Sequence, residues 1–208
     1  MTLNLRAPVT RWDDAIPLGN GLMGGLLHGE GTTVRLSLDR GDLWDERPTP
    51  TTDAPAFTWQ HWLELKEAER WDEIDRRFDS LFFHPTPTKL PGARLEITLD
   101  PAMETTEFSL DFREAVGRVR CAGDRGMEGF FSATESVAIF RIDGPPPVDW
   151  RLTPPKVLQD KLGFPPPRLF QSGSTRWFFQ AVPQGITYAF VAEMRCEGDQ
   201  SLLALTVT

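Results

Sequence analysis

A strict alternation of apolar and polar side chains at residues 34–39 is the feature that most narrows the possible folds. The segment VRLSLD places a valine or a leucine at every second position. This period of two is typical of a strand with one buried face. An apolar run at 22–28 precedes it, and the turn Gly29-Glu30-Gly31 separates the two runs. We therefore expect a β-hairpin from about Leu22 to Leu38.

Runs of the same kind recur through the second half of the chain, each bounded by Gly, Asp or Pro turns. We predict strands at 95–99, 108–112, 116–119, 127–134, 137–142, 177–182, 186–196 and 202–207. The sequence thus predicts a mainly β fold in which successive strands form an antiparallel meander. Proline-rich stretches at 144–147, 154–155 and 164–168 could link two domains. The apolar residues between them favour a surface excursion of a single domain that covers residues 1–208.

The one strong helical pattern lies at about residues 57–84. Apolar side chains recur every three or four positions from Trp62 to Phe82, and charged side chains fill the other face. The prolines of HPTPTKLPG at 84–92 end the pattern, because a residue before proline is driven out of the helical region. We expect a helical insertion, one amphipathic helix or two with a break, packed against a sheet.

The charge balance excludes some classes of partner. With 30 acidic against 22 basic side chains the net charge is -8, which repels nucleic acid and anionic lipid. No apolar run reaches the ~20 residues that a membrane span needs. The N-terminal MTLNLRAPVTRW lacks the apolar core of a secretory signal. We expect no nucleic-acid partner, no membrane association and a cytoplasmic location.

Cysteine and aromatic content leave two questions open. Cys121 and Cys196 could be separate buried thiols of a reducing compartment, or a disulfide between neighbouring strands. The 7 Trp and 14 Phe against a single Tyr fit a thick core between sheets. Tryptophans at a mouth could equally stack on sugar rings, but we expect most of them in the core.

The acidic residues around Trp44 come nearest to a catalytic cluster. A glycosidase needs two carboxylates about 5 to 10 Å apart, one with a raised pKa, and no motif singles out such a pair. Asp39, Asp42, Asp45 and Glu46 could line a sugar subsite with Trp44 as its aromatic floor. Alternatively, these acids satisfy backbone donors in a turn and solvate a loop.

Asn20 stands between two glycines, and its side chain could have either of two roles. It could be a turn residue in the left-handed region, or an amide held toward a ligand. The histidines show neither HxH nor HExxH spacing, and the GxSxG, GxGxxG and GxxxxGK[ST] motifs are absent. We expect no metal site, no cofactor and no catalytic residue in the chain.

The opening segments resemble the N-terminal β-sandwich of family 95 glycoside hydrolases, which comprise α-L-fucosidases and related α-galactosidases. The matching segments are Trp12, AIPLGNGLMGG at 15–25 and SLDRGDLW at 37–44. The order of later elements, at 108–142 and 185–194, is also similar. Two positions depart from the family pattern. Leu22-Met23 replaces its arginine, and residues 38–42 replace its Asn-Glu-Asp-Thr run.

The resemblance implies an antiparallel β-supersandwich. It also implies a non-catalytic domain, because the family carries its catalytic residues on an (α/α)6 barrel and nothing similar occurs before Thr208. The chain ends in the strand-like LALTVT, so we expect a longer polypeptide. That polypeptide would be a glycoside hydrolase that acts on a fucoside-like or galactoside-like carbohydrate, and in it the non-catalytic domain would pack on the barrel and shape its mouth. Asn20, Asp42 and Trp44 are the candidate substrate contacts.

Two other functions stay open. The chain could be a free-standing carbohydrate-binding or protein-interaction β-sandwich. It could also be a small hydrolase that uses Asp42, Asp45 and Glu46.

Overall fold

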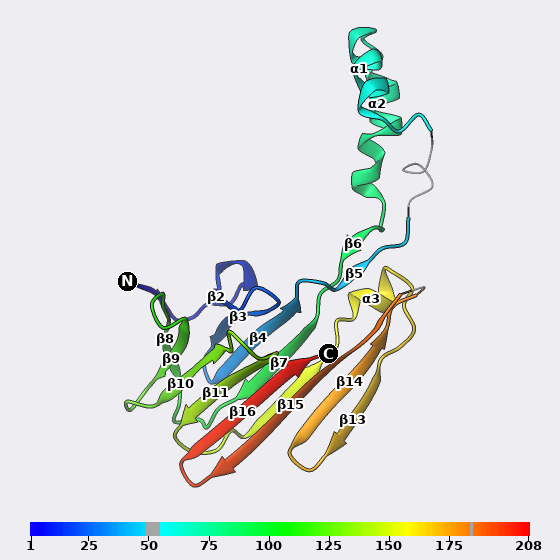
Figure 1. Cartoon of the computed structure of the whole chain (residues 1–208). Helices are drawn as coiled ribbons and strands as arrows, with labels where there is room; N and C mark the ends of the chain where they lie inside the picture. The colour runs from blue at the N-terminus through cyan, green and yellow to red at the C-terminus, as the bar shows by residue number, and fades with distance from the viewer. Residues whose placement is uncertain (49–54, 184) are drawn as a thin grey trace.

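The computed structural model describes residues 1–48, 55–183 and 185–208, which form two packed antiparallel sheets with a helical arm at one end (Figure 1). The larger sheet has nine strands in the order β1-β8-β9-β10-β11-β16-β15-β14-β13. The predicted mainly β, antiparallel sandwich is confirmed. The strands are β1 (Thr2–Arg6), β8 (Thr105–Asp111), β9 (Val116–Cys121), β10 (Gly126–Phe131), β11 (Val137–Asp143), β13 (Arg168–Ser172), β14 (Thr175–Ala181), β15 (Thr187–Glu197) and β16 (Gln200–Val207).

The second sheet has five strands and contains the predicted hairpin. Its order is β12 (Asp149–Thr153), β7 (Ala93–Thr98), β4 (Thr33–Arg40), β3 (Met23–Glu30) and β2 (Ile16–Gly19), and a short 3-10 helix, η1 (Trp12–Asp14), precedes β2. Strands β3 and β4 pair from Met23 opposite Arg40 to Glu30 opposite Thr33. The hairpin is thus confirmed. It begins one residue later than predicted and ends two residues later, at Arg40.

Alternation along each strand sends one set of side chains between the two sheets. On β16, for example, Leu203, Leu205 and Val207 are buried, whereas Leu202 is 45% exposed. Removal of apolar surface from water, at roughly 25 cal/mol per Å², holds the layers together. The largest fully buried side chains are Tyr188, Phe108, Phe140, Phe178 and Phe190.

The proline-rich residues 144–167 carry the chain from one sheet to the other. After β11 of the large sheet, β12 pairs with β7 of the small sheet, and β13 then pairs with β14 of the large one. The short helix α3 (Val157–Asp160) lies between them and buries Leu158.

The helical insertion forms an arm, which we define as residues 55–87. It comprises α1 (Trp59–Glu67), α2 (Trp71–Arg77) and the 3-10 helix η2 (Asp79–Phe83). A two-stranded ribbon of β5 (Trp44–Asp45) and β6 (Thr88–Lys89) connects it to the sandwich. The hydroxyl of Thr58 caps α1 by accepting from the His61 amide at 3.2 Å.

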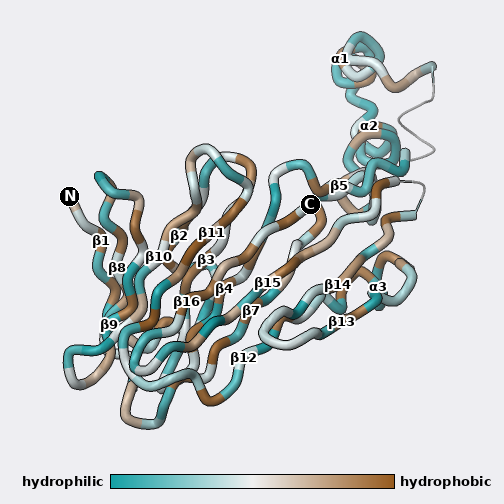
Figure 2. The backbone as a smooth tube through the Cα atoms, turned by 60° about the horizontal axis from the view of Figure 1, so that its bottom comes forward, coloured by the Kyte–Doolittle hydropathy of each residue, from teal (hydrophilic) through white to brown (hydrophobic). Residues whose placement is uncertain are grey.

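The arm projects away from both sheets, so the prediction that it packs against a sheet is wrong. Figures 1 and 2, which differ by a 60° rotation, both show it clear of the sandwich. Only part of the apolar stripe that suggested a sheet-facing side packs within the arm, because Trp71 and Phe82 of the same stripe are exposed. Leu65 and Ile74 are buried there, and the rings of Phe57 and Phe78 stack at 5.0 Å between centroids.

The tryptophans also differ from expectation, because none of the seven is fully buried. Trp12, Trp44, Trp59 and Trp71 are exposed, and the other three are half-buried. The core uses phenylalanine, aliphatic side chains and the single tyrosine, Tyr188, instead. The indole N–H explains this choice, since a sheet interior offers it few partners.

Two further sequence questions receive answers from the described residues. Both cysteines are free, Cys121 buried on β9 and Cys196 exposed on β15, and burial raises the pKa of the Cys121 thiol to about 11. No helix in the described part of the chain is long and apolar enough to cross a membrane.

Candidate functional site

The candidate site lies at the end of the sandwich from which the arm rises. There β4 ends and the chain turns at Gly41, whose amide donates to the oxygen of Leu22 at 2.7 Å. Leu43 is 1% exposed and pins the following loop into the core. Its oxygen accepts from the Leu90 amide at 3.0 Å, which fixes the loop against the returning chain. The loop with Asp42 and Trp44 is therefore anchored to the sandwich by these contacts.

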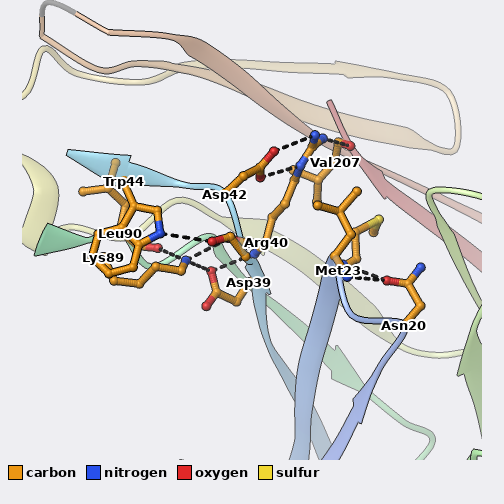
Figure 3. A network of polar contacts seen from close by, with 11 residues as sticks. Asn20, Met23, Asp39, Arg40, Asp42, Trp44, Lys89, Leu90 and Val207 are labelled. Atoms are coloured by element: carbon orange, nitrogen blue, oxygen red, sulfur yellow. Dashed lines mark hydrogen bonds and ion pairs between the residues drawn. The ribbon is translucent and has the colours of Figure 1, made fainter. Parts of the chain in front are cut away.

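Arg40 holds this loop and the last strand together (Figure 3). Its Nε and Nη2 donate to the two carboxylate oxygens of Asp42 at 2.8 and 3.0 Å, and its Nη1 donates to the oxygen of Val207 at 2.8 Å. The paired geometry is the strong form of a charge-assisted hydrogen bond. Asp42 is consequently an oriented carboxylate.

Lys89 makes a second anchor on the other side of the loop (Figure 3). Its Nζ donates to Oδ1 of Asp39 at 2.6 Å and to the main-chain oxygens of Arg40 and Leu90 at 2.8 and 3.0 Å. Three acceptors use the three donors of the ammonium group. The end of β4 is thus tied to β6, which begins the return from the arm.

Trp44 borders a hollow of about 320 Å³ at this end. Its Nε1 donates to the oxygen of Gly41 at 3.1 Å, while its side chain stays 45% exposed. The lining combines an aromatic ring and two carboxylates with an apolar wall from the β14–β15 loop. The lining residues are Asp42, Trp44, Glu46, Arg47, Pro48, Val182, Pro183, Gly185 and Ile186.

Asp45, which stands between the lining residues Trp44 and Glu46 in the chain, has a fully buried side chain that is paired to Arg47. Nε and Nη2 of Arg47 donate to its carboxylate at 2.9 and 2.6 Å, and Nη2 also donates to the oxygen of Leu162 at 3.2 Å. Burial alone would raise the pKa of Asp45, but the hydrogen bonds and charge of Arg47 outweigh it, so this pKa lies below its usual value. Asp45 is an ionised structural anchor.

Both the oxygen and the nitrogen of the Asn20 side-chain amide form hydrogen bonds within the chain. Oδ1 accepts from the amides of Leu22 and Met23 at 3.1 and 2.8 Å, which closes the β2–β3 turn. Nδ2 donates to the oxygen of Ser132 at 2.7 Å and to that of Glu135 at 3.5 Å, on the β10–β11 turn. Asn20 thus joins the two sheets. A ligand would have to replace one of these bonds to reach it.

A comparison with known protein families identifies the chain. Residues 3–201 match the family model described as glycosyl hydrolase family 65, N-terminal domain. The chain belongs to this family. The prediction of an N-terminal β-sandwich domain of a glycoside hydrolase is confirmed, whereas the match does not support the narrower assignment to family 95. A comparison of this chain with curated proteins found no match.

In this family 65 domain the structure brings two of the three predicted site residues together. Asp42 and Trp44 line the same hollow, and Asn20 is not among its lining residues. Sequence reasoning missed Arg40 and Lys89, which position the loop. The alternation of acids with Arg40 and Arg47 between positions 39 and 47 was the available signal, since closely spaced opposite charges indicate ion pairs within a loop.

The described residues of the domain hold no group of three or more His, Cys, Asp or Glu side chains arranged to bind a metal ion. The arrangement at the arm end is suited to noncovalent recognition of a polar ring. An aromatic face is available there beside a carboxylate whose position is fixed by Arg40.

Proposed function

We propose that this domain packs on a helical catalytic barrel of the same polypeptide, shapes the mouth of its active site, and contributes carbohydrate contacts through Asp42 and Trp44. Membership of a glycosyl hydrolase family as the N-terminal domain supports a role beside a catalytic domain. The site at the arm end supplies the surface for that role.

The exposed ring of Trp44 beside Asp42 and Glu46 is the observation that carries the proposal. An aromatic plane attracts the axial C–H groups of a sugar, and carboxylate oxygens accept from its hydroxyl groups. Both oxygens of Asp42 keep acceptor capacity after the bonds from Arg40, because each has two lone pairs. A sugar would therefore meet an oriented acceptor next to a flat apolar surface.

The same geometry argues against catalysis by this chain alone. A glycosidase needs a protonated carboxyl group with a raised pKa. Asp45 is ionised beneath Arg47 with a lowered pKa, and both oxygens of Asp42 are hydrogen-bonded by Arg40. In a hydrolase that used Asp42, Asp45 and Glu46, Asp45 could not act as the proton donor, because it is ionised.

The substrate class follows from the sequence resemblance alone. The segments at 15–25 and 37–44 resemble those of α-L-fucosidases and related α-galactosidases, which supports a fucoside-like or galactoside-like ligand. In that proposal Asn20 contributes through the turn it stabilises rather than through a free amide.

The sugar contact can be tested on the 208-residue chain by ¹⁵N NMR of the seven indole N–H groups. Titration with L-fucose and with D-galactose at millimolar concentrations should shift the Trp44 signal, which Trp44→Phe identifies by its loss. Trp12, 61% exposed and outside the hollow, is the internal control and should not move. An unmoved Trp44 signal with both sugars contradicts a sugar contact at this hollow.

Two further observations test the rest of the proposal. The coding sequence beyond Thr208 should continue into a helical domain, and a stop codon there would contradict a barrel in the same polypeptide. Nitrophenyl fucosides and galactosides should not be hydrolysed by the purified chain. Turnover that is lost in Asp42→Asn would overturn the non-catalytic role.

A further inference from the structure

The charged groups around the hollow of Trp44 pair with one another and leave a single carboxylate over. Each cation that lines the hollow or holds its loop has an acidic partner of its own. The pairs are Arg40 with Asp42, Lys89 with Asp39, and Arg47 with the buried Asp45. Glu46 also lines the hollow, is exposed, and forms no ion pair with any residue that the structure describes. The hollow therefore keeps one uncompensated negative charge.

That free carboxylate lies on the same side of the chain as the exposed indole ring. Trp44, Asp45 and Glu46 are in turn exposed, buried and exposed, and the strand β5 includes the first two. In an extended chain, residues i and i+2 project to one side and stand roughly 7 Å apart. Trp44 and Glu46 thus face the hollow together, while Asp45 points to the interior.

The pair of an indole ring and a free carboxylate is suited to a protonated amine. The face of a tryptophan attracts a cation that lies within about 6 Å of its centre, and it does so more strongly than the other aromatic side chains. A carboxylate accepts charge-assisted hydrogen bonds from an ammonium group. The bond from Nε1 of Trp44 to the oxygen of Gly41 orients the ring, which stays 45% exposed.

An anionic ligand meets the opposite conditions. Arg47 is the only cation among the lining residues, and Asp45 already neutralises it through bonds of 2.9 and 2.6 Å. The whole chain carries a net charge of -8, so its field attracts cations and repels anions. The hollow should therefore prefer a cationic sugar to a neutral one, and a neutral sugar to an acidic one.

We propose that this hollow binds an amino sugar and that Glu46 is the residue that determines this specificity. The sugar ring lies on Trp44, its ammonium group donates to Glu46, and its hydroxyl groups donate to Asp42. This inference rests on the proposed sugar contact at the hollow and adds to it the charge class of the ligand. N-acetylation of the amine removes the charge, so it should also remove the preference.

The indole signal of Trp44 in ¹⁵N NMR of the 208-residue chain measures the affinities. D-galactosamine, N-acetyl-D-galactosamine, D-galactose and D-galacturonate are titrated at about pH 6, where an ordinary amine is protonated. An exposed ion pair and an exposed cation–π contact are each modest. We therefore expect galactosamine to bind with a dissociation constant about fivefold below that of galactose. N-acetylgalactosamine should resemble galactose, and galacturonate should bind most weakly.

Two variants assign the preference to Glu46. Glu46→Gln should bring galactosamine to the affinity of galactose, whereas its affinity for galactose should stay the same. Glu104→Gln is the matched control, because Glu104 is exposed and does not line the hollow, and it should keep the full preference. Added salt should reduce the preference in the unaltered chain, since it screens exposed charges.

The outcomes separate this inference from the proposed sugar contact. Equal dissociation constants for galactosamine and galactose would overturn the amino-sugar preference and leave the sugar contact standing. A preference that survives Glu46→Gln would overturn the role of Glu46. If none of the four sugars moves the Trp44 signal, the sugar contact itself is wrong, and the amino-sugar site is wrong with it.

Discussion

Nη1 of Arg40 donates a hydrogen bond to the main-chain oxygen of Val207 across 2.8 Å, which joins the end of β4 to the end of the last strand. The same guanidinium binds both oxygens of Asp42. One side chain thus couples the closure of the sandwich to the orientation of the candidate sugar-contacting loop. Stability and site geometry should therefore change together when it is altered.

Arg40→Ala should lower the free energy of unfolding by about 1–3 kcal/mol, because it removes charge-assisted bonds from a guanidinium that is only 22% exposed. Urea denaturation measures the change. Arg151→Ala is the matched control, since Arg151 is 71% exposed and pairs with Asp149 only at the surface, so it should be nearly neutral. Equal losses in the two variants would contradict a special role for Arg40.

Asn20→Ala should destabilise the domain by about 1–3 kcal/mol, because the Leu22 and Met23 amides and the Ser132 oxygen lose their partner. Asn20→Asp keeps the acceptor but not the donor, so its loss of stability should be smaller. The only other asparagine of the chain, Asn4, is exposed, and Asn4→Ala provides the control. If Asn20→Ala is as stable as Asn4→Ala, the amide is free to serve a ligand instead.

The sequence was sufficient to predict the sheets because period-two alternation directly reports which strand face is buried. Residues 34–39 show this clearly, and they became the central strand β4. The same reasoning failed for the arm. A period of 3.6 residues shows that a helix has an apolar face, but it cannot show whether that face meets a sheet, its own neighbour or another molecule.

The candidate site was predicted only in part, for a similar reason. Asp42 and Trp44 are close in sequence, so a loop brings them together whatever the fold. The far wall of the hollow comes from Val182, Pro183, Gly185 and Ile186, about 140 residues away, and only the pairing of β14 with β15 beside β16 places it there. Contacts of this range depend on strand order, which alternation does not encode.

Gly92→Ala should destabilise the domain by about 1–3 kcal/mol. A Cβ at this position would lie 2.4 Å from Cζ of Phe190 and 2.7 Å from the oxygen of Leu38, so both a core ring and a strand would have to move. Phe190→Leu in the same chain should recover only part of the loss, since the main-chain contact remains. A Cβ at Gly41 would lie no closer than 3.6 Å to another atom, so Gly41→Ala should leave the stability nearly unchanged. Thermal unfolding of the three variants measures these differences.

The two thiols should react at very different rates with a thiol-specific reagent. Cys196 is exposed, whereas Cys121 is buried and its thiol pKa is raised to about 11, which leaves little thiolate near neutral pH. One equivalent should react quickly in the native protein and the second only on unfolding. Cys196→Ser should abolish the fast phase. Two unreactive thiols that become reactive after reduction would instead indicate the disulfide that the sequence left open.

The buried pair of Asp45 and Arg47 should make the free energy of unfolding depend on pH. The pKa of Asp45 is lowered in the folded state, so its contribution is present above the unfolded pKa of about 3.9 and is lost as the pH falls through the folded value. At neutral pH, Asp45→Asn should cost about 3 kcal/mol, because it leaves Arg47 without a buried counter-charge. The difference in the free energy of unfolding between the two proteins should shrink below about pH 4.

Glu46→Gln, at an exposed acid on the same loop, is the control. Urea denaturation from neutral to acid pH gives the comparison, and a difference that stays constant across this range would show that Asp45 is not ionised in the folded protein.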